Sequence, residues 1–72
     1  MKRIKKFEGL IYDGKVIGET KVTFLTGELY KGCFDENFMK TGLGINMIPG
    51  KDAHLYYGTF KRNQYHGLGK IF

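Results

Sequence analysis

The sequence has 72 residues, a formal net charge of +5, 42% hydrophobic residues and one cysteine. This length allows a single small domain, near the lower limit at which a conventional core stabilises itself. One cysteine excludes an intramolecular disulfide and a cysteine-based zinc cluster within one chain. No apolar run is long enough for a signal peptide or approaches the roughly 20 residues of a membrane-spanning helix. We therefore expect a cytoplasmic protein.

The N-terminus is basic, whereas the charge of the remaining chain is close to balanced. One interpretation of positions 1–6 is an arm that attracts an anionic surface, since each cation near such a surface contributes about 1 kcal/mol. The other interpretation is a solvated terminus that aids solubility. Both stay open. The residues that would bind an anionic surface are Lys2, Arg3, Lys5 and Lys6.

An aromatic residue followed two positions later by glycine occurs three times, and a second glycine signal follows each occurrence. A period in this range is typical of a stacked repeat, in which one supersecondary unit cannot bury its apolar face alone. We place the repeats at 7–29, 30–55 and 56–72 of a single domain at 7–72. The three occurrences are Phe7-Glu8-Gly9, Tyr30-Lys31-Gly32 and Tyr56-Tyr57-Gly58, and the second signals are at Gly18, Gly42 and Gly67.

The first repeat is predicted to be a β-hairpin, because its residues alternate with period two rather than at helical spacing. Asp13-Gly14 is a strong hairpin signal, since a tight type I′ turn needs positive φ at both central residues. The return strand is expected from about Gly18 to Leu25.

The second and third repeats follow the same plan. Strands are expected at 30–34 and 42–48 around a turn at 35–37, and Pro49 ends the second because proline cannot donate to a strand ladder. The third repeat has strands at 56–60 and 67–72 around a turn at Arg62-Asn63. The longer second repeat predicts loops that protrude at its turn and near 49–54. The fold class is therefore all-β: a single-layer antiparallel meander of about six strands, built from three stacked hairpins without a helix.

The glycines at equivalent strand positions have a physical role in this scheme. A glycine weakens a strand but permits other groups to approach the backbone closely. We expect these glycines to leave space in which aromatic rings lie flat, which gives a thin layer with no second sheet. The rings on this face form a candidate surface for a partner's peptide segment. They belong to Tyr30, Phe34, Tyr56 and Phe60.

This order of an aromatic-x-Gly, a second aromatic, a turn and Gly-x-Gly resembles the MORN repeat, the membrane occupation and recognition nexus motif. The first repeat matches less well, with Thr20 where the second glycine is expected. The resemblance covers positions 7–72 and implies scaffolding, organelle or cytoskeletal attachment and adaptor roles. The residues that carry it are Tyr30, Gly32, Phe34, Gly42 and Gly44 in the second repeat, and Tyr56, Gly58, Phe60, Gly67 and Gly69 in the third.

The opposite face departs from that family, which usually carries Lys, Thr and Glu there. A single-layer sheet that is apolar on both faces leaves one face exposed unless something covers it. Two alternatives are open: the ends of the sheet curl so that side chains cover one another, or a second copy or another protein covers the face. The candidate interface residues are Cys33, Leu43, Ile45, Met47, Leu68 and Phe72.

No catalytic, metal or cofactor site is expected. His54 and His66 have no neighbour at metal-ligand spacing, serine is absent, and Cys33 lacks a base in the sequence. The acidic residues, Glu28 among them, are expected in turns and at exposed strand positions.

We therefore expect a non-enzymatic protein–protein interaction module, acting as a small adaptor or as an inhibitor that occupies a partner's surface, with a homodimer as one form. The alternative is binding to an anionic phospholipid surface through the basic N-terminus. Nucleic-acid binding has less support, because the rings recur at core positions of the repeat. The start at Met1 suggests a native beginning, and the end at Phe72 leaves either an open edge or a continuation in a longer array.

Overall fold

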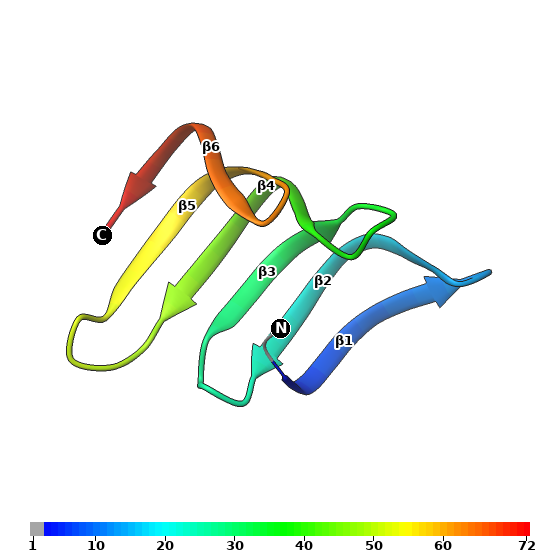
Figure 1. Ribbon diagram of the computed structural model, residues 1–72, viewed down its shortest axis with the longest axis horizontal. Coiled ribbons are helices and arrows are strands. Elements are labelled where there is room, and N and C mark those ends of the chain that lie inside the picture. Colours follow the sequence, from blue (N-terminus) through cyan, green and yellow to red (C-terminus); the bar gives the residue numbers. More distant parts are fainter. Residues whose placement is uncertain (1–2) are drawn as a thin grey trace.

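Six antiparallel strands form one sheet in which sequence order is also spatial order (Figure 1). The computed structural model describes residues 3–72, and in this range no helix is present, which confirms the all-β single-layer meander. The strands are β1 (Ile4–Tyr12), β2 (Lys15–Phe24), β3 (Leu29–Phe34), β4 (Lys40–Ile48), β5 (His54–Lys61) and β6 (Gln64–Ile71).

The basic N-terminal segment enters the sheet earlier than the repeat pattern indicates. Because β1 begins at Ile4, Lys5 and Lys6 are strand residues rather than part of a separate arm. Lys2, the first of the four predicted cationic residues, lies outside the described residues.

The turn at Asp13-Gly14 has the backbone geometry that the sequence predicts, and the predicted turn at Arg62-Asn63 has the same geometry. Asp13 and Gly14 have φ of 52° and 74°, and Arg62 and Asn63 have φ of 51° and 67°. Positive φ at both central residues is the mark of a type I′ turn, whose twist matches that of the flanking strands. As predicted, β4 also ends immediately before Pro49.

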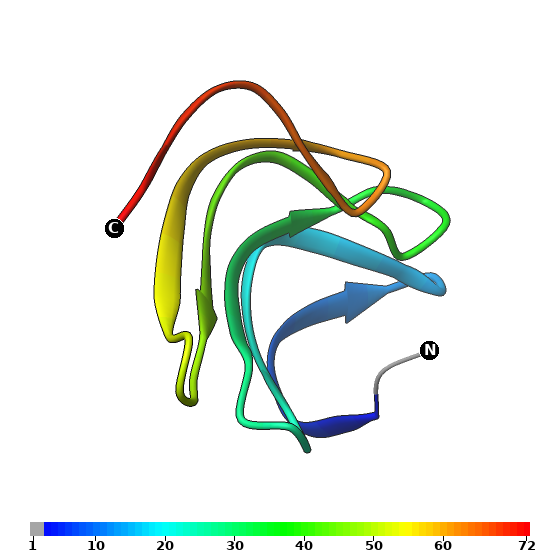
Figure 2. The same cartoon turned by 60° about the vertical axis from the view of Figure 1, so that its left-hand side comes forward.

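The same bulge occurs in all three hairpins. Between Glu8 and Leu10, β1 advances by two residues, while the paired stretch of β2, from Ile17 to Lys21, advances by four. The corresponding irregularities lie between Lys31 and Cys33 and between Gly58 and Phe60. Extra residues in one strand bend it and increase its twist, so three bulges in line curl the whole sheet. The curl is plain in Figure 2.

The second glycine of each repeat makes this bulge possible. Gly18, Gly42 and Gly67 have φ of 70°, 72° and 69°, a left-handed conformation that side chains rarely adopt. The sequence pattern predicts that they leave space for rings and that the return strands begin at or near them. In the structure these strands begin earlier, at residues 15, 40 and 64, and continue through the glycine.

Other glycines do provide space for the rings. The Tyr30 ring lies against Gly32 and Gly44, and the Tyr56 ring lies against Gly58 and Gly69. A Cβ atom on Gly58 would stand 2.5 Å from the Cα of Gly69, closer than real Cβ contacts allow. The prediction of rings lying over strand glycines is therefore confirmed at these positions.

The inner surface of the curled sheet, which we call the concave face, holds the core. The Phe60 ring stands edge-on to Tyr30 and to Tyr56, with centroids 5.3 and 5.1 Å apart. Such T-shaped pairs are favourable beyond the area that they bury. The curl thus covers this face, while the other face stays outside. The buried apolar core consists of Val22, Phe24, Tyr30, Tyr56 and Phe60, with Phe7 and Phe34 packed against it.

One sequence expectation is wrong. Glu28 was expected at an exposed position, but it is buried in the concave face together with Lys40. Each charge is stabilised by the other, and a buried charge is tolerated only when it is paired and hydrogen-bonded.

Candidate interaction surfaces

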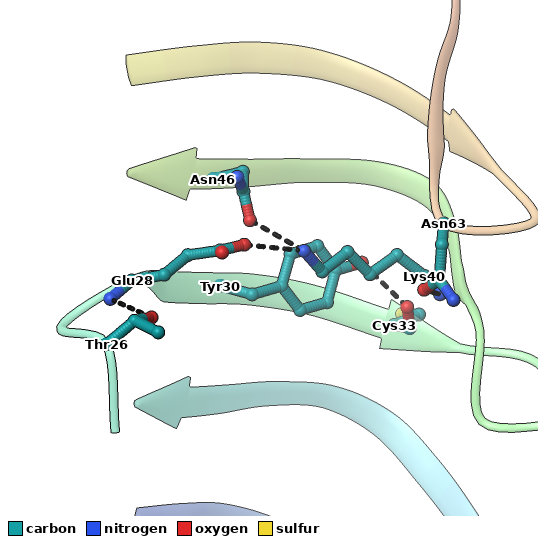
Figure 3. A network of polar contacts seen from close by, with 7 residues as sticks. All are labelled: Thr26, Glu28, Tyr30, Cys33, Lys40, Asn46 and Asn63. Carbon is teal, nitrogen blue, oxygen red and sulfur yellow. Dashed lines mark hydrogen bonds and ion pairs between the residues drawn. The ribbon is translucent and has the colours of Figure 1, made fainter. Parts of the chain in front are cut away.

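A polar network occupies the floor of the concave face (Figure 3). The Lys40 ammonium donates to Oε2 of Glu28 and to Oδ1 of Asn46, each at 2.9 Å. Its Nζ also lies 5.1 Å from the ring centroid of Tyr30 and 5.5 Å from that of Phe24. A cation within about 6 Å of an aromatic face is attracted by the ring quadrupole. The network therefore joins β3 to β4 beneath a set of aromatic side chains.

Hydrogen bonds with backbone atoms hold Lys40 and Tyr30, which lie side by side in this network. The backbone N–H of Lys40 donates to Oδ1 of Asn63 at 2.7 Å, and the backbone N–H of Asn63 donates to the Lys40 carbonyl at 3.2 Å. These two bonds tie the β5–β6 turn to the start of β4. The Tyr30 hydroxyl donates to the Cys33 carbonyl at 2.7 Å. Burial, with a smaller contribution from the nearby Cys33, raises the pKa of Tyr30 to about 12.

An apolar groove of about 850 Å³ opens on the concave face beside this network. One wall is formed by β1 and the other by the β3–β4 turn, while Lys40 and the Asn63 side chain contribute polar groups. This size and this mixture of apolar walls with a few polar groups are typical of ligand-binding concavities. The lining residues are Ile4, Phe7, Ile11, Phe24, Phe34, Asn37, Phe38, Met39, Lys40 and Asn63.

The turn wall of the groove is held rigidly. Oδ1 of Asp35 accepts from the backbone N–H groups of Asn37 and Met39 at 2.8 and 3.0 Å. Within this turn Phe38 has φ of 58°, a conformation that is unusual for a bulky residue. Its side chain is nevertheless 57% exposed and lines the groove. The chain therefore tolerates local strain at a position that presents an aromatic ring to the groove.

The four rings of the predicted partner-binding face have different surroundings. Tyr30, Tyr56 and Phe60 are buried and form the core, so their rings contact one another. Phe34 is half-buried and lines the groove. Contact with a partner stays a prediction for all four, and Phe34 is the one that the groove exposes.

The six predicted interface residues come together on the outer face of the sheet. Gly44 lies beneath the Tyr30 ring, so the alternation of β4 directs Leu43, Ile45 and Met47 to the opposite side. Cys33 and Ile45 are half-buried, and the other four are exposed. We call the exposed apolar residues that β4, β5, β6 and the chain end place on this outer face the convex patch: Leu43 (58% exposed), Met47 (42%), Tyr57 (46%), Leu68 (90%) and Phe72 (73%).

The convex patch crosses three strands and the chain end. Ile45 is paired with Tyr57, and Met47 is paired with Leu55. Leu55 and Phe72 exchange backbone hydrogen bonds of 3.1 and 2.8 Å, which holds the chain end beside β5. Cross-strand pairs of this kind stand about 5 Å apart, so Ile45, Met47, Leu55, Tyr57 and Phe72 are apolar neighbours. Leu43 lies opposite Thr59, at one end of this group.

Lysines lie beside and within the convex patch. Lys31 is paired with Ile45 and with Lys21, whereas Lys70 is paired with Tyr57 and lies between Leu68 and Phe72 on the outer face. Lys31 also lies 3.8 Å from Glu19, but both side chains are more than half exposed, so this pair adds little stability.

Residues 3–72 contain no group of three or more His, Cys, Asp or Glu side chains that could hold a metal ion. In the same range there is no helix of the length and apolar character needed to cross a membrane. The His54 ring contacts the Asp52 carbonyl at 3.2 Å, in the loop between β4 and β5.

The comparisons with known proteins gave no relative from which a role is transferred. No family model, no curated protein and no solved structure matches this chain significantly. The resemblance to the MORN repeat therefore stays a prediction that depends on the residues that carry it.

Proposed function

We propose that this chain is a non-enzymatic protein–protein interaction module of the MORN-repeat kind that acts in the cytoplasm. It serves as a small adaptor, or as an inhibitor that occupies its partner's surface. The observation that carries this proposal is the convex patch, a set of large apolar side chains exposed on a hydrogen-bonded sheet. Contiguous apolar surface of this kind on a small protein is typical of a binding site.

The rigidity of the sheet supports the proposal. The backbone beneath the convex patch is fixed by the β4–β5 and β5–β6 ladders, so little backbone entropy is lost when a partner binds. Interface cores are enriched in aromatic residues and methionine, and this patch contains Met47, Tyr57 and Phe72. A partner of matching apolar shape, whether another protein or a second copy of the chain, would cover these side chains.

An adaptor needs two separate surfaces, and an inhibitor needs one. The convex patch and the groove lie on opposite faces of the same sheet, so two partners bind without excluding each other. This arrangement favours the adaptor form.

Site-specific photocrosslinking tests the proposal. A benzoylphenylalanine is placed at Met47, within the convex patch, or at Lys51, an exposed position in the β4–β5 loop that does not line the groove, as the matched control. We expect one discrete crosslinked product from position 47, either with a second copy or with another polypeptide, and none from position 51. Equal labelling from both positions, or none from position 47, would contradict the proposal.

Binding to an anionic phospholipid surface is the second candidate function. The observation that favours it is the presence of Lys21, Lys31 and Lys70 on the same face as the convex patch, in addition to Arg3, Lys5 and Lys6 near the N-terminus. Sedimentation with phosphatidylserine vesicles at low and high salt tests it, because binding driven by lysines weakens as salt screens the charges. Nucleic-acid binding has less support, because three of the rings that would stack with bases are buried.

A further inference from the structure

The groove lies directly beside an open edge of the sheet. We propose that an extended, acidic segment of a partner protein adds as a seventh strand to the free edge of β1 and places its apolar side chains in the groove. This surface is separate from the convex patch, so the two proposals fail independently.

The backbone edge of β1 is available for pairing. In the part of the chain that the structure describes, β1 pairs on one side, with β2, and stands at the end of the strand order. Eight of its nine residues are exposed. An unpaired row of backbone N–H and C=O groups is a ready template for strand addition.

The groove provides contacts for the side chains of the added segment. Ile4, Phe7 and Ile11 of β1 line it, and Ile4 and Phe7 pair with the buried Phe24 and Val22 of β2. A strand added to β1 at the normal spacing of about 4.8 Å would set every second side chain on the groove side, beside Phe7, Gly9 and Ile11. The ring of Phe38 and the side chain of Met39 would cover the added side chains from the turn wall.

The position of the groove favours β1 rather than β6 as the edge strand to which the segment adds. No residue of β6 lines the groove, although β6 is also an edge strand. A strand added to β6 would gain backbone bonds without an apolar cavity for its side chains.

Charge defines the kind of segment that fits. Residues 3–12 contain Arg3, Lys5 and Lys6 but one carboxylate, Glu8. Lys6 and Glu8 form an exposed ion pair with 3.3 Å between Nζ and Oε1, which leaves the edge cationic as a whole. A segment with acidic side chains on its outward face complements this charge. Because side chains alternate along a strand, the segment has apolar and acidic residues in alternation.

The strand pairs inside the sheet indicate the size of one residue in the added segment. Where Gly32 and Gly58 lie beneath a ring of their own strand, the residues opposite are Thr20 and Gly44, both small. On β1 the Phe7 ring lies over Gly9 in the same way, with its Cζ 3.1 Å from the position of a glycine Cβ. The residue of the added segment that faces Gly9 is therefore expected to be small.

Selection from a library of short random displayed peptides tests the proposal. We expect the enriched peptides to alternate apolar with acidic residues around a small central residue, and to protect β1 amides from hydrogen exchange. We also expect methylation of their edge-facing backbone nitrogens to abolish binding, because a methylated nitrogen cannot donate to β1. Enriched peptides with apolar residues at helical spacing, or peptides that bind equally well when methylated, would overturn strand addition.

Two neighbouring substitutions on β1 supply the matched control. Ile11→Asn places a polar amide in the groove, and Leu10→Asn places the same group one residue away on the outer face, where the native side chains are 60% and 70% exposed. Neither variant changes the charge of the edge, so their difference measures the groove contact. We expect Ile11→Asn to weaken binding of the selected peptide about tenfold more than Leu10→Asn does. Equal weakening, or no enrichment from the library, would contradict the proposal and would leave the lysines of β1 as residues that prevent pairing. Circular dichroism of both variants confirms that the comparison is between folded proteins.

Discussion

The Lys40 ammonium lies 2.9 Å from Oε2 of Glu28, and the two side chains are only 10% and 3% exposed. This pair crosses the concave face from the start of β4 to the residue before β3, at the centre of a sheet that has no second layer to cover it. Removing one partner of a buried ion pair leaves an uncompensated charge, which is more costly than replacing both partners.

The first prediction concerns this ion pair. Lys40→Met should lower the free energy of unfolding by about 3–5 kcal/mol, because Glu28 is left charged and buried. Urea unfolding followed by circular dichroism measures the loss. The double variant Lys40→Met/Glu28→Met should recover most of it, since both charges are then removed. Removal of the exposed Lys31–Glu19 pair serves as the control and should cost less than about 1 kcal/mol. A double variant no more stable than the single one would contradict this account.

The second prediction concerns the glycines beneath the rings. Gly58→Ala should destabilise the protein by about 1–3 kcal/mol, because its Cβ would stand 2.5 Å from the Cα of Gly69 and 2.5 Å from the Tyr56 hydroxyl. Thermal unfolding provides the measurement. Gly14→Asn is the matched control, since no atom lies within 4 Å of a Cβ there and asparagine tolerates the positive φ of a type I′ turn. If Gly58→Ala were as well tolerated as Gly14→Asn, the close ring packing would be wrong.

The third prediction concerns the strained turn residue. Phe38→Asn should raise the free energy of unfolding by about 0.5–1 kcal/mol, because asparagine adopts the left-handed conformation at a lower cost than phenylalanine. Arg62→Asn relieves a similar φ of 51° in a residue that does not line the groove and serves as a reference for strain alone. If Phe38 serves the groove, only Phe38→Asn should also weaken the peptides selected for β1. A loss of stability in Phe38→Asn would show that the ring contributes more to the fold than its backbone costs.

The fourth prediction concerns alkaline pH. The pKa of Tyr30 is raised from 10.0 to about 12 in the folded state, so the folded protein retains a proton that the unfolded chain loses. The stability that depends on this proton is complete below about pH 10 and is lost as the pH rises toward 12, by roughly 2–3 kcal/mol. Urea unfolding at several pH values in this window measures the slope. Tyr30→Phe removes the ionisable group and should flatten it, and an unchanged slope would contradict the assignment to Tyr30.

Much of the fold follows from short-range signals in the sequence. Asp13-Gly14 and Arg62-Asn63 identify two turns, and Pro49 ends a strand, because each acts on its own backbone. The bulges were not predicted, because a strand glycine has two roles that look the same in a sequence. Gly44 provides room for a ring, while Gly42 adopts a left-handed φ, and only the pairing register separates them.

The polar network was missed for a different reason. Glu28 is in phase with Tyr30, and Lys40 and Asn46 are in phase with Gly44, so strict alternation places all of them on the aromatic face. The assumption that charged residues avoid a core overrode that signal. Which charges pair inside depends on contacts between distant residues, and one sequence does not contain that information. The outer apolar residues, by contrast, lie on one face because alternation alone decides their side, and their role as an interface stays a prediction.

The most direct test of the central claim measures how tightly the partner crosslinked at position 47 binds to two charge variants. Met47→Asp places a carboxylate in the convex patch, and Lys51→Asp places one in the exposed β4–β5 loop. If the convex patch is the interaction surface, Met47→Asp weakens binding about tenfold or more, Lys51→Asp has little effect, and high salt leaves binding unchanged. Equal loss in both variants, or loss of wild-type binding in high salt, would show that charge rather than the apolar patch holds the partner.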